Sequence, residues 1–142
     1  MKLYEYQAKE ILHKYNINVP KGEAVTDVEG ATKIYNQLGT ERCVIKSQVL
    51  AGGRGKGGGV RIVNTLEEVK DYTSKIIGSH LITSQTGEKG VLVNKVLVAE
   101  AIDIKKRIIP GNLNRQECIK NHHNKQHRGW YRNRRSLFKN TS

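Results

Sequence analysis

The sequence predicts a mixed α/β (α+β) domain, and three observations support this fold class. Segments with apolar residues every three or four positions alternate with short runs rich in valine and isoleucine, as expected for helices alternating with strands. A glycine-rich loop at 51–59 separates two of the β-prone runs. The run VLVNKVLVA at 91–99 is the most β-prone part of the chain, and its centre, Val96 to Val98, is expected to be buried on both faces of a sheet.

The first three elements are expected to be a helix, a strand and a second helix. The spacing of apolar residues predicts an amphipathic helix from Tyr4 to Tyr15, and Glu23 to Thr26 reads as a short strand. Asp27 is the expected N-cap of a helix from Val28 to Leu38, which Gly39 would end. The buried stripe of that helix should consist of Ala31, Ile34, Tyr35 and Leu38.

The second half of the domain is expected to add one helix and further strands. Asn64 would cap the third helix, Glu67 would complete an approximate capping box, and Gly78 would end it. A weak strand is expected at 81–83, a polar turn at 84–90 and a strand at 91–99. With 23–26 and the two strands beside the glycine loop, the domain should contain at least five strands. The inward face of the third helix should be formed by Val69, Tyr72, Ile76 and Ile77.

The glycine loop is the strongest functional signal in the chain. Six of the nine residues at 51–59 are glycine, and β-prone residues precede and follow the loop at 44–45 and 60–63. Glycine lets backbone N–H groups approach a small ligand, and Lys46, Arg54 and Lys56 concentrate positive charge there. The loop is no Walker A motif, because Gly57 stands where Ser or Thr is required. We expect a hairpin that binds a polyphosphate; a flexible hairpin or linker is the alternative.

Most of the net positive charge lies in the last quarter of the chain. The 142 residues carry a formal net charge of +12, of which +4 lies in 1–106 and +8 in 107–142. Cys43 and Cys118 form neither a metal-binding spacing nor a disulfide framework. No apolar run approaches the length of a membrane span, and the start of the chain is too charged for a secretory signal. We therefore expect a cytoplasmic protein without a membrane partner.

Residues 1–106 resemble the N-terminal ATP-grasp portion of the β subunit of succinate–CoA ligase (succinyl-CoA synthetase). The resemblance rests on EYQAKEIL near the start, VIKSQVLAGGRGKGGGV in the centre, ITSQTG, and VNKVLVAEAIDIKK before position 107. These motifs occur in the family's order and spacing. The resemblance implies that residues 1–106 are an incomplete ATP-grasp domain with a glycine-rich phosphate hairpin, and it covers a minority of the family's usual length.

The resemblance also implies a set of nucleotide-binding residues. Lys46 corresponds to the lysine that pairs with α/β-phosphate oxygens, and Gly53, Arg54 and Gly55 to the loop that covers the phosphates. Glu100 to Ile102 fall where the hinge strand binds the purine edge, although the family often has Glu at the position of Ala99. As alternatives, Lys46 could be a solvated strand end and Glu100 a surface partner of a lysine.

The implied enzyme is an acid–thiol ligase of the tricarboxylic acid cycle in the bacterial cytoplasm. In this family ATP or GTP phosphorylates a histidine of a partner α subunit, and the phosphohistidine then activates succinate for thioester formation with CoA. None of the chain's five histidines matches that residue. The family's Mg²⁺ ligands lie beyond residue 142, so no catalytic and no metal-binding residue is expected here. The chain alone is expected to be inactive.

The family pattern stops at Arg107, and we expect residues 107–142 to be a basic, frame-shifted and disordered tail. Reading A/T-rich codons one base later converts 107–116 into ELFLGILIDR and 128–136 into EGGIEIEEV, which resemble the family's continuation. Lys105 and Lys106 indicate a run of adenines, where a base is easily gained or lost. Sequencing many independent copies of the encoding DNA tests this, and an intact frame throughout would contradict it.

Two further functions remain open from the sequence. A malate–CoA ligase β subunit shares the same N-terminal pattern, and this chain contains no residue that distinguishes the acids. A small basic nucleic-acid-binding protein would instead use residues 107–142, where arginines alternate with Trp130 and Tyr131. We disfavour nucleic acid as a partner because that function leaves residues 1–106 unexplained.

Overall fold

The computed structural model describes residues 2–106, and the first compact unit of the chain ends at Asp103. The predictions for 107–142 lie outside the described residues. The elements in chain order are α1 (Glu5–Lys14), β1 (Gly22–Val25), α2 (Val28–Leu38), β2 (Cys43–Ser47), β3 (Val60–Val63), α3 (Leu66–Ile76), β4 (His80–Leu81), β5 (Val91–Leu92) and β6 (Val96–Glu100). The mixed α/β class and the expectation of at least five strands are confirmed.

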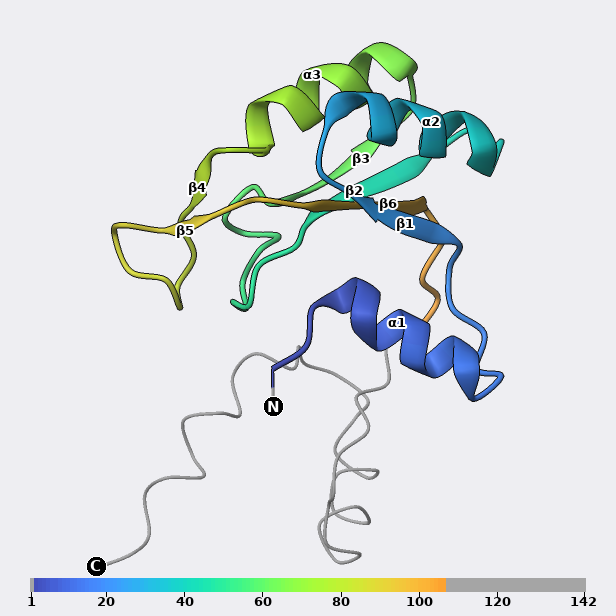
Figure 1. The fold of residues 1–142 in the computed structure, drawn as a ribbon, viewed down its shortest axis with the longest axis horizontal. Helices are drawn as coiled ribbons and strands as arrows, with labels where there is room; N and C mark the ends of the chain where they lie inside the picture. Colours follow the sequence, from blue (N-terminus) through green and yellow to red (C-terminus); the bar gives the residue numbers. More distant parts are fainter. Residues whose placement is uncertain (1, 107–142) are drawn as a thin grey trace, which may run out of the picture. The chain divides into compact units, whose positions relative to one another are not determined.

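A four-stranded antiparallel sheet organises the unit. Its strand order is β1-β6-β2-β3, while β4 and β5 form a separate two-stranded sheet. Figure 1 shows α2 and α3 together on one face of the large sheet and α1 on the opposite side. Because β2 and β3 pair directly, the glycine loop joins two antiparallel strands as the sequence predicted.

The hydrophobic core lies between the sheet and the helix pair α2 and α3. Cys43 and Ile45 of β2 are fully buried and pack with Ala31 of α2 and Val69 of α3. Side chains alternate along a strand, so Val44 and Lys46 point to the face on the α1 side, where both are half-buried. Strand β6 is buried on both faces, as predicted, and Val96, Leu97 and Val98 have no exposed surface.

Helix α2 matches its prediction at both ends. The Asp27 side chain accepts a hydrogen bond of 2.6 Å from the Gly30 N–H, and Gly39 adopts the left-handed conformation with φ of 60°. These signals are local in sequence, which is why the bounds could be read directly. Of the expected stripe, Ala31 and Ile34 are buried, whereas Tyr35 and Leu38 pack on the core while partly exposed.

Helix α1 forms where predicted, but its apolar residues are not buried. No residue of α1 is buried, and Ile11 and Leu12 expose 41% and 38% of their surface. Polar contacts instead attach the helix to the rest of the unit. Lys9 Nζ donates to the Pro20 carbonyl at 3.0 Å, and the Tyr6 N–H donates to Gln48 Oε1 at 3.3 Å.

Three local predictions were wrong. Thr65, and not Asn64, is the N-cap of α3, because its hydroxyl accepts from the Glu68 N–H. Glu68, and not Glu67, is the acidic residue that bonds back, since its carboxylate accepts from the Asn64 N–H. The weak strand lies at 80–81 in place of 81–83. The run at 91–99 forms two strands, since Val93 exchanges backbone hydrogen bonds with Gly78 and Ser79 between them.

Within residues 2–106, no helix is both long and apolar enough to cross a membrane.

Candidate functional site

The glycine loop is a compact turn held against its neighbours. The N–H groups of Gly57, Gly58 and Gly59 donate to the carbonyls of Gly53, Gly55 and Arg54, and these bonds close the turn. The Tyr72 hydroxyl of α3 donates to the Gly58 carbonyl at 2.5 Å. A Cβ at Gly57 would collide with the Ile82 carbonyl oxygen, so glycine is required there. Such a fixed turn is unlike a flexible linker.

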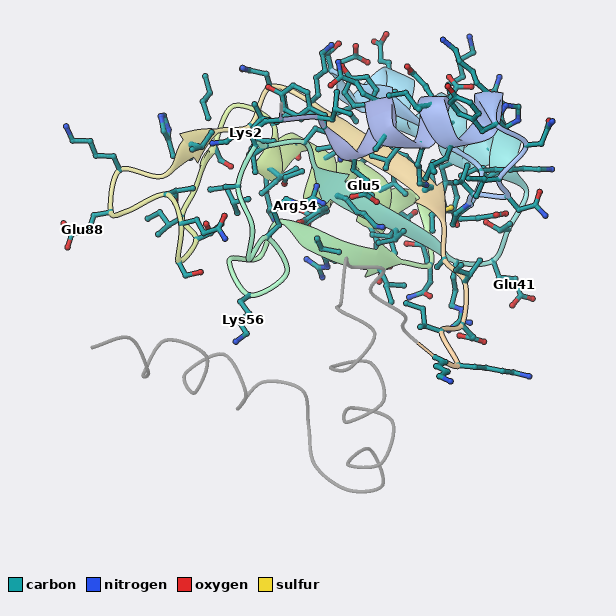
Figure 2. All side chains as sticks on the ribbon, turned by 90° about the horizontal axis from the view of Figure 1, so that it is seen from below. Lys2, Glu5, Glu41, Arg54, Lys56 and Glu88 are labelled. Carbon is teal, nitrogen blue, oxygen red and sulfur yellow. The ribbon has the colours of Figure 1, made fainter. Side chains whose placement is uncertain are left out.

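Two of the three cations predicted from sequence, Lys46 and Arg54, meet at one carboxylate. Lys46 lies near the end of β2, and its Nζ donates to Oε1 of Glu5 at 2.7 Å. Arg54 lies in the glycine loop, and its Nη2 donates to Oε2 of Glu5 at 2.7 Å. The Nη1 of Arg54 donates to the Ser47 carbonyl at 2.6 Å. Figure 2 shows Glu5 beside Arg54, with Lys56 at the outer end of the loop.

This three-residue group, Glu5, Lys46 and Arg54, is half-buried. The side chains of Glu5, Lys46 and Arg54 expose 23%, 28% and 22% of their surface. Burial raises the pKa of Glu5, but hydrogen bonds and charges from Lys46 and Arg54 outweigh it and leave the pKa below 4.5. Burial, and then the charge of Lys46, lower the pKa of Lys9. Positive charge is therefore concentrated around Glu5.

The loop residues predicted to cover a phosphate lie beside these cations. Gly53 has φ of 78°, a left-handed conformation that favours glycine. The N–H groups of Gly53, Arg54 and Gly55 donate none of the three hydrogen bonds that close the turn. Backbone donors and two cationic side chains thus occur within one short stretch, a combination suited to a phosphate group.

Glu100 and Ile102 lie farther along the sheet. Glu100 ends β6 opposite Cys43, whereas Lys46 lies opposite Leu97, a separation of three strand residues or roughly 10 Å. The Glu100 carboxylate accepts from the Lys21 N–H at 2.9 Å, and its own N–H donates to the Lys21 carbonyl. Ile102 follows the strand and is 58% exposed. The structure therefore joins Lys46 with Arg54 and places Glu100 and Ile102 apart from them.

Sequence reasoning missed Glu5 and Gln48. Gln48 is 4% exposed, and its side chain links the Tyr6 N–H to the Lys46 carbonyl, with the latter bond at 3.0 Å. Glu5 lies 41 positions from Lys46 and 49 from Arg54. Glu5 occupies the first helical turn, where acidic residues are common, and only its occurrence in the EYQAKEIL motif distinguished it.

A wide cleft lies elsewhere. Its volume is about 1030 Å³, and α1, the segment 18–21 and β1 form much of its wall. Lys9 and His13 line it, but Lys46 and Arg54 do not. Among the described residues, no group of three or more His, Cys, Asp and Glu side chains could hold a metal ion.

Comparison with known proteins agrees with these features. The family model for the ATP-grasp domain matches residues 2–116. The succinate–CoA ligase [ADP-forming] β subunit of Paraburkholderia xenovorans is 48% identical over 111 residues. The same subunit from Cupriavidus taiwanensis is 50% identical over 108 residues. These matches cover 78% and 76% of this chain, and the chain spans only 28% of the length of either relative.

The fold has a counterpart among solved structures. The crystal structure of phosphoribosylamine–glycine ligase from Thermotoga maritima superposes with a TM-score of 0.53 at 24% identity. The superposition covers 72% of this chain and 23% of that protein, and it supports the fold alone. Since the family model matches most of the chain, the chain belongs to the ATP-grasp family, and its relatives at 47–50% identity are β subunits of succinate–CoA ligase.

Proposed function

We propose that this chain is the nucleotide-binding N-terminal part of a succinate–CoA ligase β subunit. The meeting of Lys46 and Arg54 at Glu5, beside the glycine loop, is the observation that carries the proposal. Lys46 near the end of β2, Arg54 in the loop and the backbone amides of the loop provide N–H donors whose hydrogen bonds phosphate oxygens can accept. In this function Lys46 binds α/β-phosphate oxygens, and Gly53 to Gly55 cover the phosphates.

The purine would lie along the sheet toward the end of β6. Glu100 is roughly 10 Å from the level of Lys46 along the strands, which leaves room for a ribose between base and phosphates. Backbone groups at 100–102 would contact the base edge. The Glu100 side chain is already bonded to the Lys21 N–H, so backbone contacts are the more natural role there.

The complete reaction requires parts that lie outside residues 2–106. The proposed enzyme is an acid–thiol ligase that couples ATP or GTP to succinyl-CoA formation with a partner α subunit in the bacterial cytoplasm. Mg²⁺ would neutralise phosphate charge in that enzyme, but the described residues contain no cluster that could bind it. The relatives are named for succinate and ADP, which favours succinate over malate and ATP over GTP. We propose that the chain alone is catalytically inactive.

A binding experiment on the 142-residue chain tests this function. Isothermal titration calorimetry with ATP, with GTP and with each plus Mg²⁺ would measure the dissociation constants. Replacing Lys46 with alanine removes a charge-assisted hydrogen bond, so Lys46→Ala should raise the ATP dissociation constant roughly ten- to a hundredfold.

The matched control is Lys33→Ala. Lys33 is an exposed lysine of α2, on the other side of the sheet from α1, so this variant loses the same charge away from the loop. Its dissociation constant should equal that of the wild type. Equal affinities for Lys46→Ala and the wild type, or no ATP binding by the wild type, would contradict the proposal.

A further inference from the structure

Glu5 contacts both residues that are proposed to bind phosphate, Lys46 and Arg54, but it does not use all of their N–H donors. A lysine ammonium has three N–H donors, and Lys46 directs one of them at Glu5. An arginine guanidinium has five, and Arg54 directs one at Glu5 and one at the Ser47 carbonyl. Donors therefore remain on both side chains for a phosphate while the Glu5 contacts are intact.

The Glu5 carboxylate also holds the two cations close together. Its two oxygens take one cation each, at 2.7 Å in both cases. Without this carboxylate the like charges of Lys46 and Arg54 would repel each other. Both side chains are long, and each carries about 2 kcal/mol of rotamer entropy that a ligand would otherwise have to remove. A side chain fixed before binding loses less entropy when the ligand arrives.

The backbone at Glu5 is itself fixed to β2. Gln48, which is almost fully buried, accepts from the Tyr6 N–H and donates to the Lys46 carbonyl. The first turn of α1 is thus tied directly to the strand that carries Lys46. Lys95 lies over the Tyr6 ring, 5.7 Å from its centre, and adds a contact on the same turn.

We propose that Glu5 is a positioning residue that holds Lys46 and Arg54 in the arrangement that receives the nucleotide phosphates. This inference rests on the proposed nucleotide function and assigns α1 a part in that site. In the competing arrangement, the Glu5 carboxylate occupies the position of a phosphate and must move away before ATP binds. The two arrangements predict opposite effects when the carboxylate charge is removed.

The test is Glu5→Gln in the 142-residue chain, with ATP as the probe in calorimetry. Glutamine keeps the size of the side chain but raises the net charge of the site by one. Attraction between charges alone would then tighten ATP binding. Removing a carboxylate that occupies the phosphate position would tighten it as well. Positioning predicts the opposite result, a rise of the dissociation constant by about three- to tenfold. Unchanged or tighter binding would overturn the proposal.

Glu10→Gln is the matched control, since Glu10 is an exposed carboxylate of the same helix. It should bind ATP no more weakly than the wild type. A second measurement needs no nucleotide: NMR signals of the Arg54 guanidinium should be sharp in the wild type and broadened in Glu5→Gln. Amide signals of the large sheet report whether the variant remains folded.

The two measurements separate the possible failures. Sharp Arg54 signals in a wild type that does not bind ATP would refute the proposed function while showing that Glu5 orders the cation. Arg54 signals that are the same in wild type and Glu5→Gln would refute positioning even where the wild type binds ATP.

Discussion

At the residue scale, the packing of the glycine loop distinguishes glycines that are required from glycines that are tolerated. A Cβ at Gly57 would meet the Ile82 carbonyl oxygen, whereas a Cβ at Gly55 would meet nothing within 4 Å. Backbone cannot move aside as the end of a flexible side chain can. The sequence shows six glycines of equal appearance. Contacts with residues 81–85 and Ser47, and the positive φ of Gly53 and Gly58, distinguish them in the structure.

Gly57→Ala should therefore destabilise the fold, and Gly55→Ala should not. We expect Gly57→Ala to lower the free energy of unfolding by about 1–3 kcal/mol, a typical cost of forcing extra volume into a packed site. Gly55→Ala should stay within about 0.5 kcal/mol of the wild type. Urea unfolding followed by circular dichroism measures both. Equal unfolding midpoints for the two variants would show that the loop is not packed as described.

Whether the role of a single residue could be predicted depended on how far along the sequence its contact partners lie. Asp27 and Gly39 act within their own helix, and both were identified from sequence. Lys46 and Arg54 were predicted as phosphate ligands because a glycine loop with flanking cations is a recognisable phosphate pattern, and that role stays a prediction. Glu5 was not, because its partners lie in β2 and in the loop, and no local pattern brings α1 to either.

At the scale of elements, α1 is attached by polar contacts and not by a buried apolar face. Its spacing of apolar residues predicted an amphipathic helix correctly, but periodicity does not say whether a partner covers that face. The run at 91–99 illustrates the same limit. Its β propensity is high throughout, yet contacts of Val93 with 78–79 divide it into β5 and β6.

The docking of α1 should weaken in acid. Because the pKa of Glu5 is below 4.5 in the folded chain, its ion pairs stabilise the fold above pH 4.5. That contribution is lost as the pH falls below 4.5 through the folded pKa. Lys46 and Arg54 face the carboxylate directly, and the charge of Lys9 also acts on it.

A ¹³C NMR titration of the Glu5 carboxyl carbon would measure this effect. The midpoint should lie below 4.5 in the wild type and move upward in Lys46→Ala, because one stabilising cation is gone. The Tyr6 amide signal should change over the same pH range as α1 loosens. A wild-type midpoint at or above 4.5 would contradict the ion-pair arrangement.

At the scale of the whole molecule, the described unit exposes an edge strand and several large apolar side chains. Among residues 2–106, β3 is paired on one side only, with β2, and Ile62 in it is 56% exposed. An unpaired strand edge bearing apolar side chains is a template for pairing with another chain. The order of the strands itself could not be predicted, because periodicity identifies strands but not their neighbours.

We expect the chain to self-associate with increasing concentration, and Ile62→Lys to reduce this. A charge on an edge strand is a common means of blocking edge pairing. Ile17→Lys is the control, since Ile17 is 49% exposed but lies outside the strands. Sedimentation velocity over a range of concentrations would compare them. A purely monomeric wild type, or an equal effect of both substitutions, would contradict the role of β3.

The strand order has a consequence for synthesis on the ribosome. β6 occupies the middle of the sheet and is the only strand of it that pairs with β1, although it is the last of the four to be translated. While residues 96–100 remain in the exit tunnel, the nascent chain can form the β2–β3 hairpin but must leave β1 without a partner. The sheet can therefore be completed only after its final strand has emerged. Until then the unpaired strand β1 is a binding site that a chaperone could use.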